Sequence, residues 1–167
     1  HNASTMAGMA FANAFLGMSH SMAHKIGGVH HTVHGRTNAI LLPYVIRYNG
    51  TRPSKTTTWP KYNYWKADEK FQDIAKMLGL PHSTPEEAVE AYAKAVYDLG
   101  VAVGIKMNFK DQGIDEKAWK DSLHEIALLA YEDQCSPANP RLPMVADMEE
   151  IMADAYYGYA ERPGRRK

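Results

Sequence analysis

The sequence predicts an all-α protein, folded as a helical bundle of about six helices. Apolar residues recur at spacings of three and four along most of the chain, which is the period of an α-helix. Residues that typically begin and end helices flank these segments, and no segment shows the alternation of apolar and polar residues that is typical of a strand. With 167 residues, of which 45% are hydrophobic and 23% charged, the chain can form one globular domain with its own core.

The first predicted helix spans residues 3–26 and is rich in Ala, Gly and Met. An apolar helix with small side chains on several sides is usually buried between other helices, so we expect it to lie inside the bundle. Gly27 and Gly28 follow this segment. Because glycine adopts the positive φ that often ends a helix, we expect the helix to stop before Gly27.

The second predicted helix, residues 34–49, contains Pro43. Proline has no backbone N–H and its ring clashes with the preceding turn, so we expect a kink or an interruption there. The segment from residue 49 to residue 65 has the Gly, Pro and Thr content of an exposed connection. The third predicted helix, residues 68–80, ends on Gly79. Its apolar residues at helical spacing are Phe71, Ile74, Ala75 and Leu78.

The fourth predicted helix, residues 85–103, has a complete start signal. Thr84 can cap its first turn, Pro85 fits the first helical position, and Glu87 completes the spacing of a capping box. Asp115 provides a similar cap for the fifth helix. The expected buried stripe of that helix is Trp119, Leu123, Ile126, Ala127 and Ala130. A loop with three prolines, "QCSPANPRLP", precedes the last predicted helix, residues 144–158.

Five of the eight histidines lie between residues 17 and 35. His20 and His24 are four residues apart, which sets both side chains on one face of a helix. His34 follows the two glycines, so the chain can fold back and bring its side chain to the same point. Because imidazole is a common ligand of iron and zinc, three converging histidines would suit such a metal.

The spacing of these histidines alone leaves more than one interpretation open. A bare pair of histidines at i and i+4 is more often structural or exposed than metal-binding. The apolar surroundings favour the metal, because a buried imidazole without a partner costs free energy. A catalytic metal needs at least three protein ligands, and no carboxylate lies near these histidines in the sequence. Either His24 is the third ligand, or further ligands lie elsewhere.

The remaining histidines are expected to have lesser roles. We expect His30 and His31 to lie in the loop, where they face solvent or stand behind the metal ligands. We expect His82 in an exposed loop and His124 on an exposed face of a helix.

The segment "AGMAFANAFLGMSHSMAHKIGGVHHTVHGRTNAILLPYVIRYN" resembles the histidine-rich motif of the iron-containing (group III) alcohol dehydrogenases. The later stretch "DQCSPANPRLP" and the ending "YYG" are similar to the C-terminal region of the bifunctional aldehyde-alcohol dehydrogenases within that family. The resemblance spans nearly the whole chain. It implies that residues 1–167 are the helical, metal-binding C-terminal domain of an iron-type dehydrogenase, a fragment of a longer chain without its α/β nucleotide-binding domain.

The resemblance also implies roles for three histidines. In the family, a divalent iron, sometimes replaced by zinc, is held by an Asp and a His of an earlier helix and by two His of the motif. The two motif ligands correspond to His20 and His34. His24 corresponds to the non-ligand histidine beside the nicotinamide cofactor and the substrate, which is implicated in proton transfer. The metal would polarise the alcohol oxygen while hydride leaves for the nicotinamide.

The activity implied by the resemblance is the NAD-dependent interconversion of short-chain aldehydes, such as acetaldehyde, and primary alcohols. NAD(H) would be bound mainly by the absent domain, and the absent Asp and His would complete the Fe²⁺ or Zn²⁺ site. We expect the isolated chain to bind metal weakly, to be inactive and to form homo-oligomers through apolar surface that the parent chain normally covers. The alternatives are a stand-alone helical metal-binding or assembly module without redox activity, and a packing module whose histidines are structural.

Composition argues against several other classes of protein. Lys plus Arg and Asp plus Glu both number 19, so no strong field would attract nucleic acid or an anionic membrane, and the basic ending "RPGRRK" is expected to be a solvated tail. The single cysteine, Cys135, excludes an internal disulfide and fits the reducing cytoplasm. No apolar run reaches about eighteen residues, and the first segment lacks the basic flank of a signal peptide.

Overall fold

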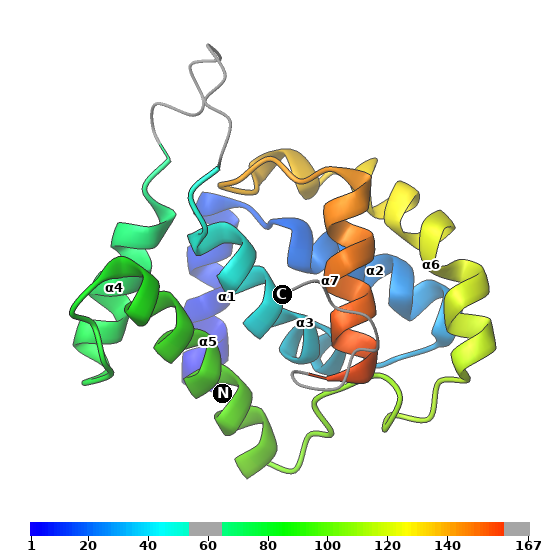
Figure 1. Ribbon diagram of the computed structural model, residues 1–167, viewed down its shortest axis with the longest axis horizontal. Helices are drawn as coiled ribbons and strands as arrows, with labels where there is room; N and C mark the ends of the chain where they lie inside the picture. The colour runs from blue at the N-terminus through cyan, green and yellow to red at the C-terminus, as the bar shows by residue number, and fades with distance from the viewer. Residues whose placement is uncertain (54–64, 159–167) are drawn as a thin grey trace.

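The computed structural model describes residues 1–53 and 65–158. Within these residues it contains seven α-helices, one short 3-10 helix and no β-strand (Figure 1). The all-α prediction is therefore confirmed. In chain order the elements are α1 (Asn2–Ala14), α2 (Met18–His30), α3 (His34–Gly50), α4 (Ala67–Met77), α5 (Pro85–Ala102), α6 (Glu116–Tyr131), η2 (Ser136–Ala138) and α7 (Val145–Tyr157).

Helices α2, α3, α6 and α7 enclose the main core, in the centre and right of Figure 1. The rings of Phe109, Trp119 and Tyr156 stack within it, with successive centroids 4.9 Å and 5.2 Å apart. Aromatic pairs of this kind contribute about 0.5–1.5 kcal/mol each beyond the burial of their surface. Met22 and Ile26 of α2 are fully buried in the same core, so the helix that carries two of the clustered histidines is held firmly.

Helices α4 and α5 pack against each other and against the C-terminal part of α3, at the left of Figure 1. Ile46, Val89 and Ala93 form a small second core there. Gly50, the last residue of α3, allows the close approach of α5, because a Cβ at Gly50 would lie 2.5 Å from a methyl carbon of Val89.

Several predicted helix ends are confirmed. The hydroxyl of Thr84 accepts a hydrogen bond from the N–H of Glu87, and the carboxylate of Asp115 accepts one from the N–H of Ala118. Gly79, just past the end of α4, has a φ of +68°. Each of these signals is local in sequence, which is why the pattern alone predicted them.

The predicted apolar stripes are buried to different extents. The stripe of α6 is buried at Trp119, Ile126, Ala127 and Ala130 and half-buried at Leu123. On α4 the stripe is buried at Ala75, half-buried at Phe71 and Ile74, and exposed at Leu78. Among the described elements helix α4 packs mainly against α3 and α5, so much of its surface stays exposed.

The prediction of one continuous first helix is wrong. The structure has two helices there, because the chain turns at Phe15, whose φ is +63°. The N–H of Met18, at the start of α2, donates a hydrogen bond to the side-chain oxygen of Asn139, which lies 121 residues further on. A Cβ at Gly17 would lie 2.7 Å from that oxygen, so only the bare glycine admits the contact. A partner so distant leaves no trace in the local pattern.

The predicted stop at Gly27 is also wrong. Helix α2 continues through Gly27 and Gly28 to His30, and the left-handed residue that ends it is His31, with a φ of +54°. The buried face of α2 outweighs the cost of glycine in a helix, about 1 kcal/mol for each residue. A Cβ at Gly27 would lie 3.4 Å from the carbonyl oxygen of Thr32, which is ordinary van der Waals contact, so this packing does not require glycine.

Pro43 does not interrupt the second predicted helix. Helix α3 runs from His34 to Gly50 as one element, and Pro43 is buried within it. The buried residues that follow it, such as Tyr44 and Val45, pack into the main core. Their burial offsets the cost of a proline in a helix interior, which is about 3 kcal/mol.

The prediction that the first segment is buried holds for α2 and is wrong for α1. No residue of α1 is buried, and the side chains of Met6 and Met9 are 69% and 65% exposed. Phe11 and Phe15 are also exposed. Helix α1 therefore presents an apolar surface to solvent.

Two predictions concern residues that lie partly or wholly outside the described part of the chain. The exposed connection is described only at its ends, residues 49–53 and 65, and the basic tail at 162–167 is not described at all. Among the described helices, none is both long and apolar enough to cross a membrane.

Candidate functional site

The imidazole rings of His20, His24 and His34 lie together where α2 meets the start of α3. The ring centroids of His20 and His34 are 5.2 Å apart, and those of His24 and His34 are 5.3 Å apart. The centroids of His20 and His24 are 6.1 Å apart. The structure therefore brings together the three histidines that the sequence singled out.

The turn between α2 and α3 places His34 beside α2. The left-handed conformation of His31 reverses the chain. The hydroxyls of Thr32 and Thr37 then share a hydrogen bond of 2.7 Å, and the Thr37 hydroxyl donates to the carbonyl oxygen of Val33. Because these bonds fix the turn, His34 begins α3 at a defined position.

Asn38 supports the cluster, although sequence analysis did not identify it. The hydroxyl of Ser19 donates to Asn38 Oδ1 at 3.0 Å, and Asn38 Nδ2 donates to His34 Nε2 at 3.2 Å. Since an amide nitrogen only donates, Nε2 of His34 accepts this bond, and a metal ion at Nε2 would replace Asn38 as the partner of that lone pair. The available signal was the position of Asn38, one helical turn after His34.

The spacing of the His20 and His34 rings is compatible with one shared metal ion. An ion about 2.1 Å from each ring nitrogen, with about 90–110° between its ligands, holds two ring centroids about 4.5–5.2 Å apart. The centroids of His20 and His34 are 5.2 Å apart, and their planes are inclined by 54°. The rings of His24 and His34 are stacked, with 17° between the planes. Because the lone pair of an imidazole lies in the ring plane, two stacked rings do not aim at one ion.

The protonation of His20 also suits a metal ligand. Burial, and then the neighbouring His34 and His24, lower the pKa of His20 below the ordinary value of histidine. Its ring is therefore neutral at neutral pH and keeps a lone pair for a metal. Two nitrogens are fewer than the three protein ligands of a catalytic zinc site, so His20 and His34 do not complete such a site by themselves.

Asp133, in the turn after α6, contacts the third histidine of the cluster. Its Oδ2 lies 3.3 Å from His24 Nδ1 and 2.9 Å from Lys25 Nζ, and its Oδ1 accepts a hydrogen bond of 3.0 Å from the N–H of Cys135. Burial alone would raise the pKa of the Asp133 carboxyl, but the hydrogen bonds from Cys135, Lys25 and His24 hold it well below its ordinary range. The sequence pattern gave no sign of this residue.

Within the described residues, His24, Asp133 and Cys135 bring three potential metal-ligand atoms within 4.8 Å of one another. The ammonium group of Lys25 already contacts Asp133 Oδ2. Burial, and then the contact with Asp133, raise the pKa of the Cys135 thiol above its ordinary value. An ion there would have to displace a lysine and a thiol proton, so this group is better suited to holding the His24 ring.

The other histidines lie apart from the cluster. The prediction that His30 lies in the loop is wrong, because it is the last residue of α2. Its Nε2 lies 3.0 Å from the hydroxyl of Ser122, and its ring lies beside that of Trp119, with centroids 5.3 Å apart. Three other histidines outside the cluster are exposed, as predicted: His31, His82 and His124.

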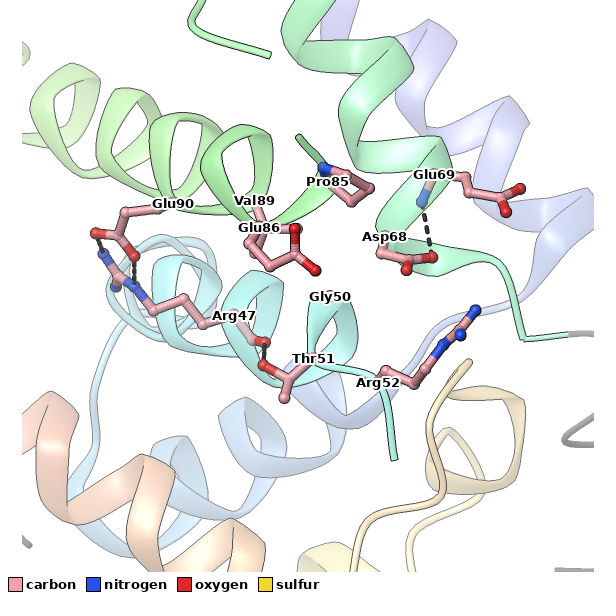
Figure 2. A pocket seen from close by; sticks show the side chains of 10 residues that line it. All are labelled: Arg47, Gly50, Thr51, Arg52, Asp68, Glu69, Pro85, Glu86, Val89 and Glu90. Carbon is pink, nitrogen blue, oxygen red and sulfur yellow. Dashed lines mark hydrogen bonds and ion pairs between the residues drawn. The ribbon is translucent and has the colours of Figure 1, made fainter. Parts of the chain in front are cut away.

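A hollow of about 660 Å³ lies between the ends of α3, α4 and α5, and no histidine lines it (Figure 2). Its charged groups are largely engaged by nearby partners. Glu90 pairs with the guanidinium of Arg47 at 2.6 Å, and Asp68 accepts a hydrogen bond from the N–H of Glu69. Acidic residues in the first turns of α4 and α5 complement the positive ends of those helices. This hollow is therefore explained by the helix ends that form it.

Comparison with protein families gives one match over most of the chain. Residues 1–156 match the model of the Fe-containing alcohol dehydrogenase family, C-terminal part. The matched region contains α1 to α6 and nearly all of α7, and it includes the whole histidine cluster.

Individual relatives agree with the family match. The chain is 80% identical over 167 residues to an aldehyde-alcohol dehydrogenase of Streptococcus pneumoniae serotype 2, with 100% of this chain and 19% of that protein covered. It is 38% identical over 161 residues to the bifunctional aldehyde-alcohol dehydrogenase AdhE of Escherichia coli, with 95% of this chain and 18% of that protein covered. The chain thus spans about a fifth of the length of these relatives.

A solved structure shows the same arrangement of helices. The crystal structure of a 1,3-propanediol oxidoreductase superimposes with a TM-score of 0.76 at 33% identity, covering 92% of this chain and 36% of that one. An alcohol dehydrogenase from Oenococcus oeni is similar, with a TM-score of 0.74 and 32% identity over 90% of this chain and 35% of that one.

Proposed function

The chain belongs to the Fe-containing alcohol dehydrogenase family, and from this premise we propose that residues 1–167 form the helical, metal-binding C-terminal domain of an NAD-dependent alcohol dehydrogenase. The proposed reaction interconverts short-chain aldehydes, such as acetaldehyde, and primary alcohols by hydride transfer. The names of the relatives support this reaction and a parent protein that is a bifunctional aldehyde-alcohol dehydrogenase. In this proposal NAD(H) is bound mainly by the rest of the parent chain.

His20 and His34 are proposed as two ligands of a divalent iron, with zinc as a possible replacement. The observation that carries this assignment is the pair of rings 5.2 Å apart and inclined by 54°, which suits one shared ion. Iron held by these residues would supply a Lewis acid for the substrate oxygen. Since a catalytic site needs more than two protein ligands, the others come from the parent chain outside these residues.

His24 is proposed as the proton relay beside the nicotinamide. Its ring is stacked on His34, so it lies next to the place where the substrate oxygen would bind. Its side chain is 34% exposed, which leaves a path for protons to solvent. Reduction of an aldehyde places negative charge on the substrate oxygen, and a neighbouring imidazole can deliver the proton that this oxygen takes up.

A cytoplasmic location and assembly into homo-oligomers complete the proposal. The location is supported by the free, buried thiol of Cys135, which suits a reducing compartment. Assembly is supported by the exposed apolar side chains of α1.

The test is anaerobic titration with Fe(II) and Zn(II), together with NADH-dependent acetaldehyde reduction, on the full-length protein that carries this chain. We expect His20→Ala and His34→Ala to lose most of the bound metal and the activity. His82→Ala, which alters an exposed histidine, is the control and should retain both. Metal content and activity unchanged in the two cluster variants would contradict the proposal.

The same titration on the isolated 167-residue chain tests the alternative of a stand-alone metal-binding module. We expect weak binding, because the chain offers only two nitrogens to the ion. Tight, stoichiometric binding that disappears in both cluster variants would favour the alternative instead.

A further inference from the structure

The carboxylate of Asp133 is fixed from three directions. Lys25 Nζ and His24 Nδ1 contact Oδ2, at 2.9 Å and 3.3 Å, while the N–H of Cys135 donates to Oδ1 at 3.0 Å. The side chain is only 7% exposed, so water competes little for these bonds. A carboxylate held in this way has one orientation available and can impose it on a neighbour.

The turn that carries Asp133 is itself joined to α2. The hydroxyls of Ser136 and Ser21 share a hydrogen bond of 2.9 Å, and both residues are buried. The N–H of Ser136 donates to the carbonyl oxygen of Asp133, which closes the turn. Since Ser21 and Lys25 are one helical turn apart on α2, two successive turns of this helix are attached to the segment after α6. The distance between Asp133 and His24 is therefore set by structure on both sides.

The contact with Asp133 determines which nitrogen of His24 carries the hydrogen. An ionised carboxylate only accepts hydrogen bonds, so Nδ1 of His24 must donate. In a neutral ring, Nε2 on the opposite edge then keeps the lone pair and can accept a proton. The His24 side chain is 34% exposed and its ring is stacked on that of His34, so the ring is partly accessible within the cluster.

We propose that Asp133 is a positioning residue, which holds the His24 ring by accepting its Nδ1 hydrogen and so keeps Nε2 as the nitrogen that exchanges protons with the substrate. This inference rests on the proposed role of His24 as the proton relay. Lys25 neutralises the buried carboxylate, and Cys135 orients it through its backbone N–H.

The first test is the tautomer of His24 in the 167-residue chain. Long-range ¹H–¹⁵N NMR spectra of ¹⁵N-histidine-labelled protein report it above about pH 8, where histidine is neutral. We expect the Nδ1–H tautomer in the wild type and a mixture of tautomers in Asp133→Ala. Asp133→Asn, which keeps the shape of the side chain, is the second variant if the alanine variant does not fold by circular dichroism.

Two control variants separate positioning from a general disturbance. Glu149→Gln removes the carboxylate that contacts His124 and should leave the signals of His24 unchanged. Lys25→Met removes the ammonium group that contacts Asp133 but keeps the acceptor, so the Nδ1–H tautomer should persist. An Asp133→Ala spectrum with the wild-type tautomer of His24 would overturn the proposal.

The second test uses the kinetics of aldehyde reduction in the full-length protein. We expect Asp133→Asn to lower kcat about 10- to 100-fold, as the loss of an outer hydrogen-bond partner does at metal sites, with little change in the KM for NADH. The double variant His24→Ala with Asp133→Asn should be no slower than His24→Ala alone, because Asp133 acts through His24.

The outcomes separate this inference from the proposed function. A normal kcat in His24→Ala would refute the proposed role of that histidine, whatever the tautomer. A low kcat in His24→Ala together with a normal kcat in Asp133→Asn would overturn the positioning role while leaving the proposed function intact. A further loss in the double variant would also overturn it, because Asp133 would then act independently of His24.

Discussion

The charge of Asp133 is stabilised entirely by its neighbours. The side chain is nearly buried, and a buried carboxylate is costly unless it is paired and hydrogen-bonded. Cys135, Lys25 and His24 supply these partners, and together they outweigh the effect of burial on the pKa. The consequence is a lowered pKa in the folded state, which links the stability of the fold to pH.

The predicted effect is a loss of stability in acid that depends on Asp133. Because its folded pKa lies below the unfolded value of about 3.9, its contribution is present above about pH 4 and is lost as the pH falls through the folded pKa. We expect Asp133→Asn to lower the free energy of unfolding by about 1–3 kcal/mol at neutral pH, and the difference to shrink below about pH 4. Urea denaturation of the isolated chain over this pH range measures both effects.

The matched control for this experiment is Asp121→Asn. Asp121 pairs with Lys117 on the exposed face of α6, where an ion pair contributes little to stability. Its variant should stay within about 0.5 kcal/mol of the wild type. An Asp133→Asn variant with the stability of the control at neutral pH would show that the buried carboxylate contributes nothing.

Among the elements, the junction between α1 and α2 depends most on a distant contact. Asn139 Oδ1 accepts hydrogen bonds from the N–H of Met18 and from Asn49 Nδ2, and Asn139 Nδ2 donates to the Asn49 side chain. Gly17 leaves room for this buried amide. One side chain thereby joins the start of α2, the end of α3 and the loop before α7.

We predict opposite effects for two glycine variants of this region. Gly17→Ala should lower the free energy of unfolding by about 1–3 kcal/mol, because the new Cβ would lie 2.7 Å from Asn139 Oδ1. The backbone of Gly17 is extended, so the clash with Asn139 and not backbone strain is the cause. Gly28→Ala meets no atom within 4 Å and should raise the stability by about 0.5–1 kcal/mol, since alanine favours a helix. Chemical denaturation measures the free energy of unfolding of both variants. Equal values for Gly17→Ala and Gly28→Ala would contradict the role of Gly17.

At the scale of the whole molecule, the exposed surface of α1 stands out against the well-packed remainder. Helices α2, α3, α6 and α7 share a core, whereas α1 has no buried residue. Contiguous exposed apolar side chains commonly mark a surface that another chain or domain covers. The centre of the fold is therefore well packed, whereas the first helix leaves apolar side chains exposed to solvent.

We predict that the isolated 167-residue chain self-associates through α1. The double variant Met9→Ser with Phe11→Ser should raise the dissociation constant of self-association by about tenfold or more, because it removes apolar area from the interface. Sedimentation velocity over a range of concentrations measures the shift. Met77→Ser, which alters an exposed methionine on α4, is the control and should associate like the wild type. A monomeric wild-type chain at all concentrations would refute the prediction.

Local signals in the sequence sufficed for the fold class, the helix starts after Thr84 and Asp115, and the convergence of three histidines. A cap lies within three residues of the groups it satisfies, and a spacing of four residues fixes the relative directions of two side chains whatever the rest of the chain does. For the same reason the core stripe of α6 was predictable. The resemblance of the histidine-rich segment to a known family was equally local, and the comparison with family models agrees with it.

The tertiary structure alone decided the break before α2, the passage of α2 through Gly27 and of α3 through Pro43, and the exposure of α1. In the first three cases packing with residues distant in the sequence overrides a local preference of a few kcal/mol at most, whereas α1 stays exposed because none of its residues is buried by the described elements. The same holds for Asp133, which lies 109 residues after His24 and contacts it only because the turn after α6 is attached to α2. Histidine spacing was enough to predict the cluster, but only the folded chain could place a buried carboxylate behind it.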